Sequence, residues 1–200
     1  MCDEDTLRER VYGLIDVARF DLQKATRFKV DGEWKCRVDV CEYIPKDNPA
    51  VILWNPTLTD RELLLALVHE LTHACLHPPG CDDFVQDEYD KEEPCSHEAA
   101  DIICRDYGVS DFQDVMLKRG VKSEGLKGND NETVEVMVER VQAALASSDV
   151  CPDWATPVDD KFRWRAAKAE AGERWRHGPT SRRRADLQRD IYGLSRSFDF

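Results

Sequence analysis

The chain has 200 residues, of which 42% are hydrophobic and 34% charged, and its formal net charge is -12. This composition is typical of a folded globular protein; it excludes a disordered chain, and no apolar stretch is long enough to span a membrane. Because the acidic start from Met1 to Asp5 has no basic and apolar signal regions, we expect a cytoplasmic protein with no membrane partner.

The first predicted element is a helix that begins at Thr6. The hydroxyl of Thr6 would cap this helix together with Glu9, which lies three positions further on. Apolar residues keep helical spacing as far as Leu22. One face of the helix therefore belongs to the core.

A hairpin and a buried strand are expected next. The Asp31-Gly32 pair predicts a tight turn between a strand at 28–30 and an alternating return strand at 34–41. A loop follows at 45–49, and the continuous apolar run at 50–54 predicts a strand that leads into the next helix.

The second predicted helix carries the main chemical signal. Thr59 and Glu62 match a capping box, and an apolar run from Leu63 to Val68 leads to His69-Glu70-Leu71-Thr72-His73. Two histidines four positions apart share one face of a helix and can bind one Zn2+ ion, with the intervening glutamate as general base. The alternative is a pair of core histidines bonded to backbone carbonyls, but burying three polar side chains without an ion is costly.

Beyond this motif the chain is expected to turn back and form short helices. Prolines and glycine at 77–80 stop regular structure, and the acidic segment 81–94 is interpreted as an exposed loop. Further helices are expected at 96–107, before Gly108, and at 110–119. Another is marked by apolar residues from Val134 to Leu145.

A catalytic zinc site uses three protein ligands and leaves one position open, so a third ligand is expected after the motif. Glu98 and His97 are the two candidates at the start of the next predicted helix. Because neighbouring residues point about 100° apart on a helix, only one of them can readily coordinate.

The motif from His69 to His73, its continuation to His77 and the segment Glu98-Ala99-Ala100-Asp101 together resemble the ImmA/IrrE-type zinc metallopeptidases. This resemblance implies an α+β zincin-like domain, with a small mixed sheet packed on helices. It also implies hydrolysis of peptide bonds in a cytosolic, regulatory protein substrate. It selects Glu98 as the third ligand, which we prefer.

The same region also resembles the SprT-like proteases, through the strand 52–56 before the motif helix. That resemblance selects His97 as the third ligand and implies action on DNA-associated proteins. The zincin resemblance further implies that the strand at 51–54 presents an edge to an extended peptide.

In the inferred mechanism Glu70 accepts a proton from water and passes it to the leaving amine. His97 and Tyr107 are candidates to stabilise the charge that builds on the carbonyl oxygen. Asp101 or Glu93 could orient a ligand histidine through its outer ring nitrogen.

Eight cysteines without a secretory signal are expected to be reduced thiols. Four of them follow the motif, and our interpretation is that these four are small core residues. The alternative is that one of them, such as Cys95, closes the zinc site. The protein would then be a catalytically silent zinc-binding regulatory module. The four are Cys75, Cys81, Cys95 and Cys104.

We expect a metallopeptidase domain at 1–148, followed by a linker and a basic, mostly helical extension at 149–200. Residues 151–200 carry 11 Lys and Arg against 8 Asp and Glu, whereas residues 1–150 carry 17 against 32. Nucleic acid is therefore expected to bind only through the C-terminal segment, if at all.

Overall fold

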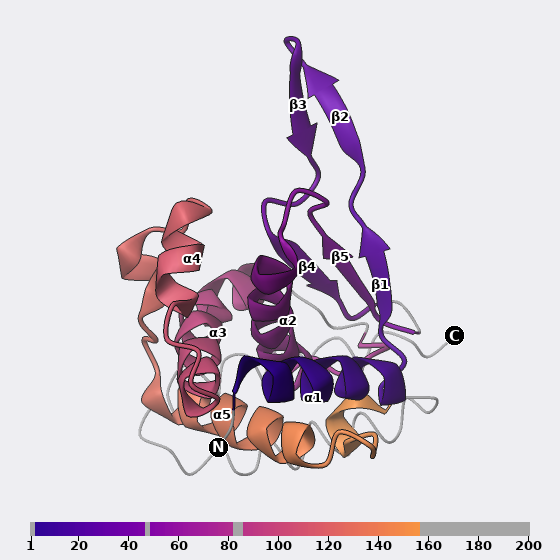
Figure 1. Ribbon diagram of the computed structural model, residues 1–200, viewed down its shortest axis with the longest axis vertical. Coiled ribbons are helices and arrows are strands. Elements are labelled where there is room, and N and C mark those ends of the chain that lie inside the picture. Colours follow the sequence, from indigo (N-terminus) through magenta and orange to yellow (C-terminus); the bar gives the residue numbers. More distant parts are fainter. Residues whose placement is uncertain (1–2, 47–48, 82–85, 157–200) are drawn as a thin grey trace, which may run out of the picture. The chain divides into compact units, whose positions relative to one another are not determined.

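The computed structural model describes residues 3–46, 49–81 and 86–156 (Figure 1). These residues form a mixed α+β fold in which a small mixed sheet and a separate hairpin accompany helices. The predicted C-terminal extension lies outside the described residues from 157 onward. The elements are α1 (Glu4–Val17), β1 (Asp21–Lys24), β2 (Arg27–Val30), β3 (Glu33–Cys36), β4 (Cys41–Ile44), β5 (Val51–Trp54), α2 (Asp60–Ala74), α3 (Gln86–Asp106), α4 (Phe112–Lys118) and α5 (Asn131–Ala146), with short 3-10 turns η1 (Ser123–Leu126) and η2 (Asp153–Ala155).

The three-stranded sheet has the order β1-β5-β4, in which β5 is parallel to β1 and antiparallel to β4. The apolar run predicted as a buried strand is confirmed, because residues 51–53 are all buried. The expectation that this strand offers an edge to a peptide is wrong, since both edges of β5 are already paired. The outer strands are β1 and β4.

The hairpin of β2 and β3 is confirmed, and it projects away from the helices (Figure 1). Asp31 and Gly32 have φ angles of 51° and 86°, the left-handed conformation that a two-residue hairpin turn requires. The return strand is shorter than predicted, because it ends at Cys36. Cys41 begins β4, which pairs in the other sheet.

The first helix differs from its prediction at both ends. Asp3, and not Thr6, is the N-cap, and its carboxylate accepts a hydrogen bond of 2.8 Å from the backbone N–H of Thr6. The helix ends before Arg19, whose φ of 56° breaks the helical path. Leu22 therefore lies in β1 and pairs with Ile52.

The α2 helix follows its prediction. The capping box between Thr59 and Glu62 is complete, with the side chain of each bonded to the backbone N–H of the other. Every residue from Leu64 to Ala74 is buried, so the two histidines of the motif lie deep in the protein.

The α3 helix begins ten residues earlier than predicted, and the interpretation of segment 81–94 as a loop is wrong from Gln86 onward. Pro94 lies inside this helix and lacks the N–H of a normal helical hydrogen bond. The residues after Pro94 pack in the main core, which supports the helix despite that loss. The predicted stop is confirmed, because Gly108 follows the helix with a φ of 78°.

The remaining helices are confirmed within a few residues. Phe112, Val115 and Met116 of α4 are buried, as is the apolar face of α5. After α5 the chain continues along the same core, in which Ala155 is fully buried. None of the helices in the described part of the chain is long and apolar enough to cross a membrane.

Candidate metal centre

The two histidines of the motif meet on one face of α2. His69 and His73 are four residues apart, and their Nε2 atoms lie 3.2 Å from each other. Both side chains are buried, with exposed fractions of 8% and 0%. Helical spacing thus aims both ring nitrogens at the same point.

A second pair with the same spacing comes from α3. Glu93 and His97 also lie four residues apart, and their side chains face the pair on α2. One Glu93 carboxylate oxygen is 3.4 Å from His69 Nε2 and 3.2 Å from His97 Nε2, and the other accepts a hydrogen bond of 2.9 Å from His73 Nε2. A single carboxylate therefore contacts three imidazoles.

The group of His69, Glu93 and His97, with both histidines buried and Glu93 partly exposed, can hold a metal ion, because one ligand atom from each lies within 4.8 Å of the others. His73 contacts the same carboxylate and extends the group to four donors. Imidazole nitrogens with a carboxylate oxygen suit transition metals better than Mg2+ or Ca2+, which prefer oxygen ligands alone.

Burial and charge act against each other within this cluster. Burial lowers the pKa of His73 to about 3 and also lowers the pKa of His97. Burial alone would lower the pKa of His69, but the adjacent Glu93 carboxylate outweighs it and raises that pKa. Burial would raise the pKa of Glu93, yet its histidine contacts lower it well below its usual range. Glu93 is therefore an anion that accepts hydrogen bonds.

The outer ring nitrogens have unequal surroundings. His73 Nδ1 lies 3.3 Å from the hydroxyl of Ser96, which can donate to this nitrogen or accept from it. The Nδ1 atoms of His69 and His97 are buried and have no hydrogen-bond partner among the described residues. The polar contacts of these two rings are therefore made by their Nε2 atoms.

Glu70 lies between the histidine cluster and the sheet. Its Oε2 accepts a hydrogen bond of 2.8 Å from the backbone N–H of Tyr43 on the outer strand β4. The side chain is buried, and its charge contributes to the raised pKa of His69. The carboxylate is thus held in one orientation close to the first histidine of the motif.

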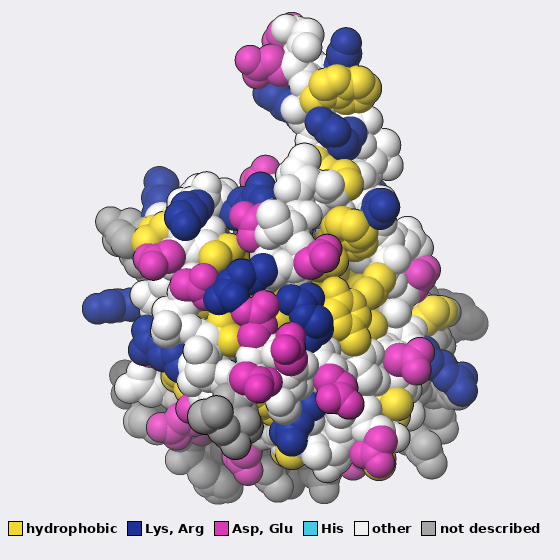
Figure 2. All heavy atoms as spheres, viewed as in Figure 1, with side chains coloured by type: hydrophobic (Ala, Val, Ile, Leu, Met, Phe, Trp, Pro, Cys, Tyr) yellow, Lys and Arg dark blue, Asp and Glu magenta, His cyan; other side chains and the backbone are white. Residues whose placement is uncertain are grey.

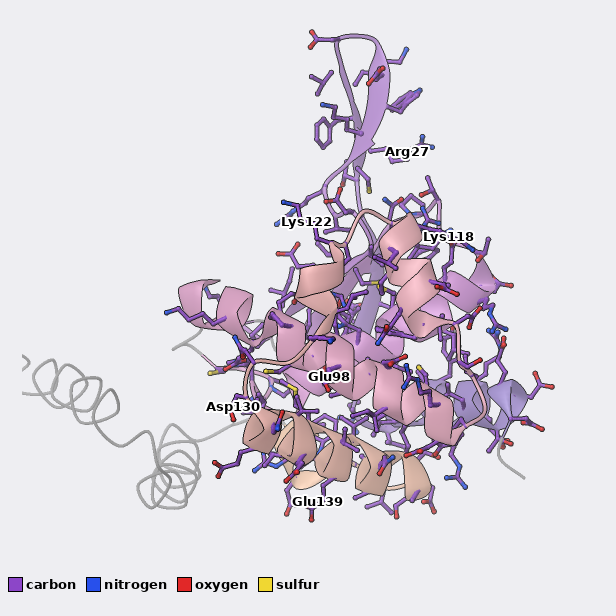
Figure 3. All side chains as sticks on the ribbon, turned by 90° about the vertical axis from the view of Figure 1, so that its left-hand side faces the viewer. Arg27, Glu98, Lys118, Lys122, Asp130 and Glu139 are labelled. Atoms are coloured by element: carbon purple, nitrogen blue, oxygen red, sulfur yellow. The ribbon has the colours of Figure 1, made fainter. Side chains whose placement is uncertain are left out.

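Glu98, the preferred third ligand from the sequence, faces a different part of the molecule. Its Oε2 accepts a hydrogen bond from the backbone N–H of Gly128, in the loop before α5. Figure 3 labels Glu98 on α3 and Asp130, the N-cap of the neighbouring α5. The structure thus brings His97, and not Glu98, to the two histidines of α2.

The other candidates also have partners elsewhere. The Tyr107 hydroxyl accepts a hydrogen bond of 2.9 Å from Arg10 of α1, ten residues or about 15 Å along the chain from His97. This contact joins α1 to the end of α3, and the role of Tyr107 at a reacting carbonyl stays a prediction. Asp101 Oδ2 pairs with Arg105 at 2.7 Å and accepts a hydrogen bond from Gln113.

The four cysteines that follow the motif are buried, which confirms their interpretation as core residues. Burial raises the pKa of Cys75 to about 12, so its thiol stays protonated near neutral pH. The Cys95 thiol donates to the side-chain oxygen of Asn129 at 3.2 Å. Among the described residues, the candidate metal group includes no cysteine.

Sequence reasoning considered Glu93 only as a residue that orients a ligand. The signal that could have found it as a direct donor is the spacing Glu93-x3-His97, which repeats the spacing of His69 and His73. That signal matters only if both residues lie on one helix. Because the segment before Pro94 was interpreted as a loop, Glu93 was not expected to lie on the same helix as His97.

Comparisons of the chain with protein-family models, with curated proteins and with solved structures found no match.

Proposed function

We propose that this protein is a zinc-dependent endopeptidase with a zincin-type site. His69, His73 and His97 would hold the zinc ion, and Glu70 would be the general base. The observation that carries the proposal is the meeting of a buried HExxH pair on α2 with a third buried histidine on α3. His97 replaces Glu98 in this assignment because Glu98 is bonded to the loop at Gly128.

The donor spacing supports zinc. Donors at about 2.0–2.1 Å from a tetrahedral zinc ion are about 3.3–3.4 Å from one another. The contacts among the three imidazoles and Glu93 fall between 2.9 and 3.4 Å. The contacts of Glu93 with the three imidazoles, and the contact between His69 and His73, therefore already have nearly the separations found between donors of a tetrahedral ion. Ser96 supplies an outer contact for His73.

A zinc ion at this site would supply a Lewis acid for the peptide carbonyl and a lowered pKa for water. The protein's own contribution is the placement of Glu70, which would take a proton from water and return it to the leaving amine. The hydrogen bond from the Tyr43 backbone keeps that carboxylate oriented beside His69. The burial of the three histidines limits competition from bulk water.

The substrate proposed is a cytosolic protein. Of the two resemblances, the SprT-like one selects His97, and it implies proteins bound to DNA as the substrate class. Of the segment 151–200 that would contact nucleic acid, residues 157–200 lie outside the described residues.

The test is zinc content measured beside cleavage of an unfolded protein such as casein. We expect Glu70→Gln to retain about one zinc per chain and to lose about 10²- to 10⁴-fold in rate. Glu135→Gln, on the surface of α5, is the matched control and keeps both properties. A protein that binds no zinc, or a Glu70→Gln variant as active as the wild type, would overturn the proposal.

A second candidate function is a zinc-binding regulatory module without turnover. The observation that favours it is the contact of Glu93 with all three imidazoles, which provides four protein donors in place of three. A structural zinc site is closed in this way. A zinc-loaded wild type that cleaves no protein, and stays inert after Glu93 is replaced, would favour this module.

A further inference from the structure

Glu93 differs from the other members of the cluster in its exposure to solvent. The side chains of His69, His73 and His97 are 8%, 0% and 5% exposed, whereas that of Glu93 is 39% exposed. Glu93 is thus the most exposed member of the cluster, and its carboxylate contacts all three Nε2 atoms.

Glu93 also stands where a fourth donor would stand. Its carboxylate is 2.9–3.4 Å from each Nε2 atom, close to the separation expected between donors of a tetrahedral site. Three histidines alone would leave the fourth position for water, as hydrolysis requires. With Glu93 in place, that position is taken by a side chain of the protein itself.

We propose that Glu93 closes the metal site of the resting protein and that the site opens when this side chain rotates toward solvent. The inference rests on the proposed function, which it extends to regulation of the same site. Rotation is feasible without movement of α3, because the glutamate side chain has several rotatable bonds and is 39% exposed. His97, one turn further along α3, can remain in place while Glu93 moves.

The neighbouring Glu92 provides a matched control. It is the same residue type on the same helix and also contacts a histidine, with 2.7 Å between its carboxylate and His77 Nε2. His77 lies beyond the end of α2 and outside the candidate metal group of the described residues. Replacement of Glu92 therefore removes a similar contact without changing the cluster.

The experiment uses the full chain loaded with Co2+, whose visible spectrum reports the coordination geometry. Acetohydroxamate, a small bidentate metal ligand, is titrated into the wild type, Glu93→Ala, Glu93→Gln and Glu92→Ala. We expect it to bind at least about tenfold more tightly to both Glu93 variants than to the wild type and Glu92→Ala. Glu93→Gln keeps the side-chain size, so it serves if the alanine variant folds poorly.

The outcomes separate the two proposals. A wild type that binds no Co2+ would contradict the proposed function. A wild type that binds Co2+ and has the same acetohydroxamate affinity as the Glu93 variants would overturn only the closure by Glu93. Loss of Co2+ from both folded Glu93 variants would also overturn it, because Glu93 would then be an essential ligand and not a movable cover.

Discussion

Between α2 and α3, polar side chains contact one another in the interior of the protein. On the β2–β3 hairpin, in contrast, large apolar side chains are exposed to solvent. Phe28 and Trp34 of the hairpin are 45% and 60% exposed, and Figure 2 shows hydrophobic and basic side chains beside each other along it. The Arg27 guanidinium and the Lys29 ammonium lie 5.4 and 5.3 Å from the centre of the Trp34 ring. The hairpin is stabilised by contacts within a dozen residues of sequence.

The histidine cluster depends on a different kind of support. Its members come from two helices that are separated by the segment 75–85, and the contacts of Glu93 with His69 and His73 form only when the helices pack. Removal of one member leaves the others buried with an unpaired group, which is more costly than the loss of an exposed contact. Substitutions in the cluster should therefore have far larger effects than substitutions in the hairpin.

The largest effect is expected from His97→Ala. Because His97 is one of the proposed zinc ligands, we expect zinc affinity to fall by more than about 100-fold, as judged by competition with a chromophoric chelator. Glu98→Ala, at the adjacent position, should change zinc affinity by less than about threefold, since its carboxylate bonds to the Gly128 backbone. The reverse result, zinc lost in Glu98→Ala and kept in His97→Ala, would restore the assignment preferred from the sequence.

An intermediate effect is expected at the other end of α2, where Glu62 is only partly buried. Hydrogen bonds from Arg119 and from the Thr59 backbone lower the pKa of Glu62 from 4.5 to about 2. The folded protein therefore keeps this carboxylate ionised where the unfolded chain protonates it. Its contribution to stability is complete above about pH 4.5 and is lost as the pH falls toward about 2.

Glu62→Gln tests this contribution through urea unfolding at several pH values. We expect a loss of about 1–2 kcal/mol at neutral pH, reduced from the full pKa shift because the pair is partly exposed to solvent. The difference from the wild type should shrink as the pH approaches about 2. A difference that stays constant with pH would show that the capping geometry, and not the charge of Glu62, provides the stability.

The local parts of the fold were predictable because their signals lie within a few adjacent residues. The Asp31-Gly32 turn and the capping box of Thr59 each require a short pattern that tertiary contacts did not override. Leu22 was assigned to the first helix because its spacing fits helical periodicity. The actual boundary depends on the left-handed backbone of Arg19 and on pairing with β5, neither of which the periodicity contains.

Only the part of the site that lies on α2 could be predicted with certainty from the sequence. His69, Glu70 and His73 form a continuous motif, so their spacing alone places the histidines together. His97 was one of two candidates at the start of the predicted helix 96–107. Glu93 as a direct donor required the knowledge that α3 continues through Pro94, against the local preference of proline. The choice between His97 and Glu98 depends on which face of α3 meets α2, and that face is fixed by packing between distant segments.

The smallest effect is expected from Trp34→Ala in the hairpin. The side chain is 60% exposed, and each of its two cation–π contacts is worth about 0.5 kcal/mol, the lower end of the range for an exposed site. We expect urea unfolding to show a loss of no more than about 1 kcal/mol, with zinc affinity unchanged. Ile52→Ala, at a fully buried position in β5, is the control and should cost about 2–5 kcal/mol. A loss of similar size in both variants would mean that the hairpin unfolds together with the core, and the contrast with the histidine cluster would then no longer hold.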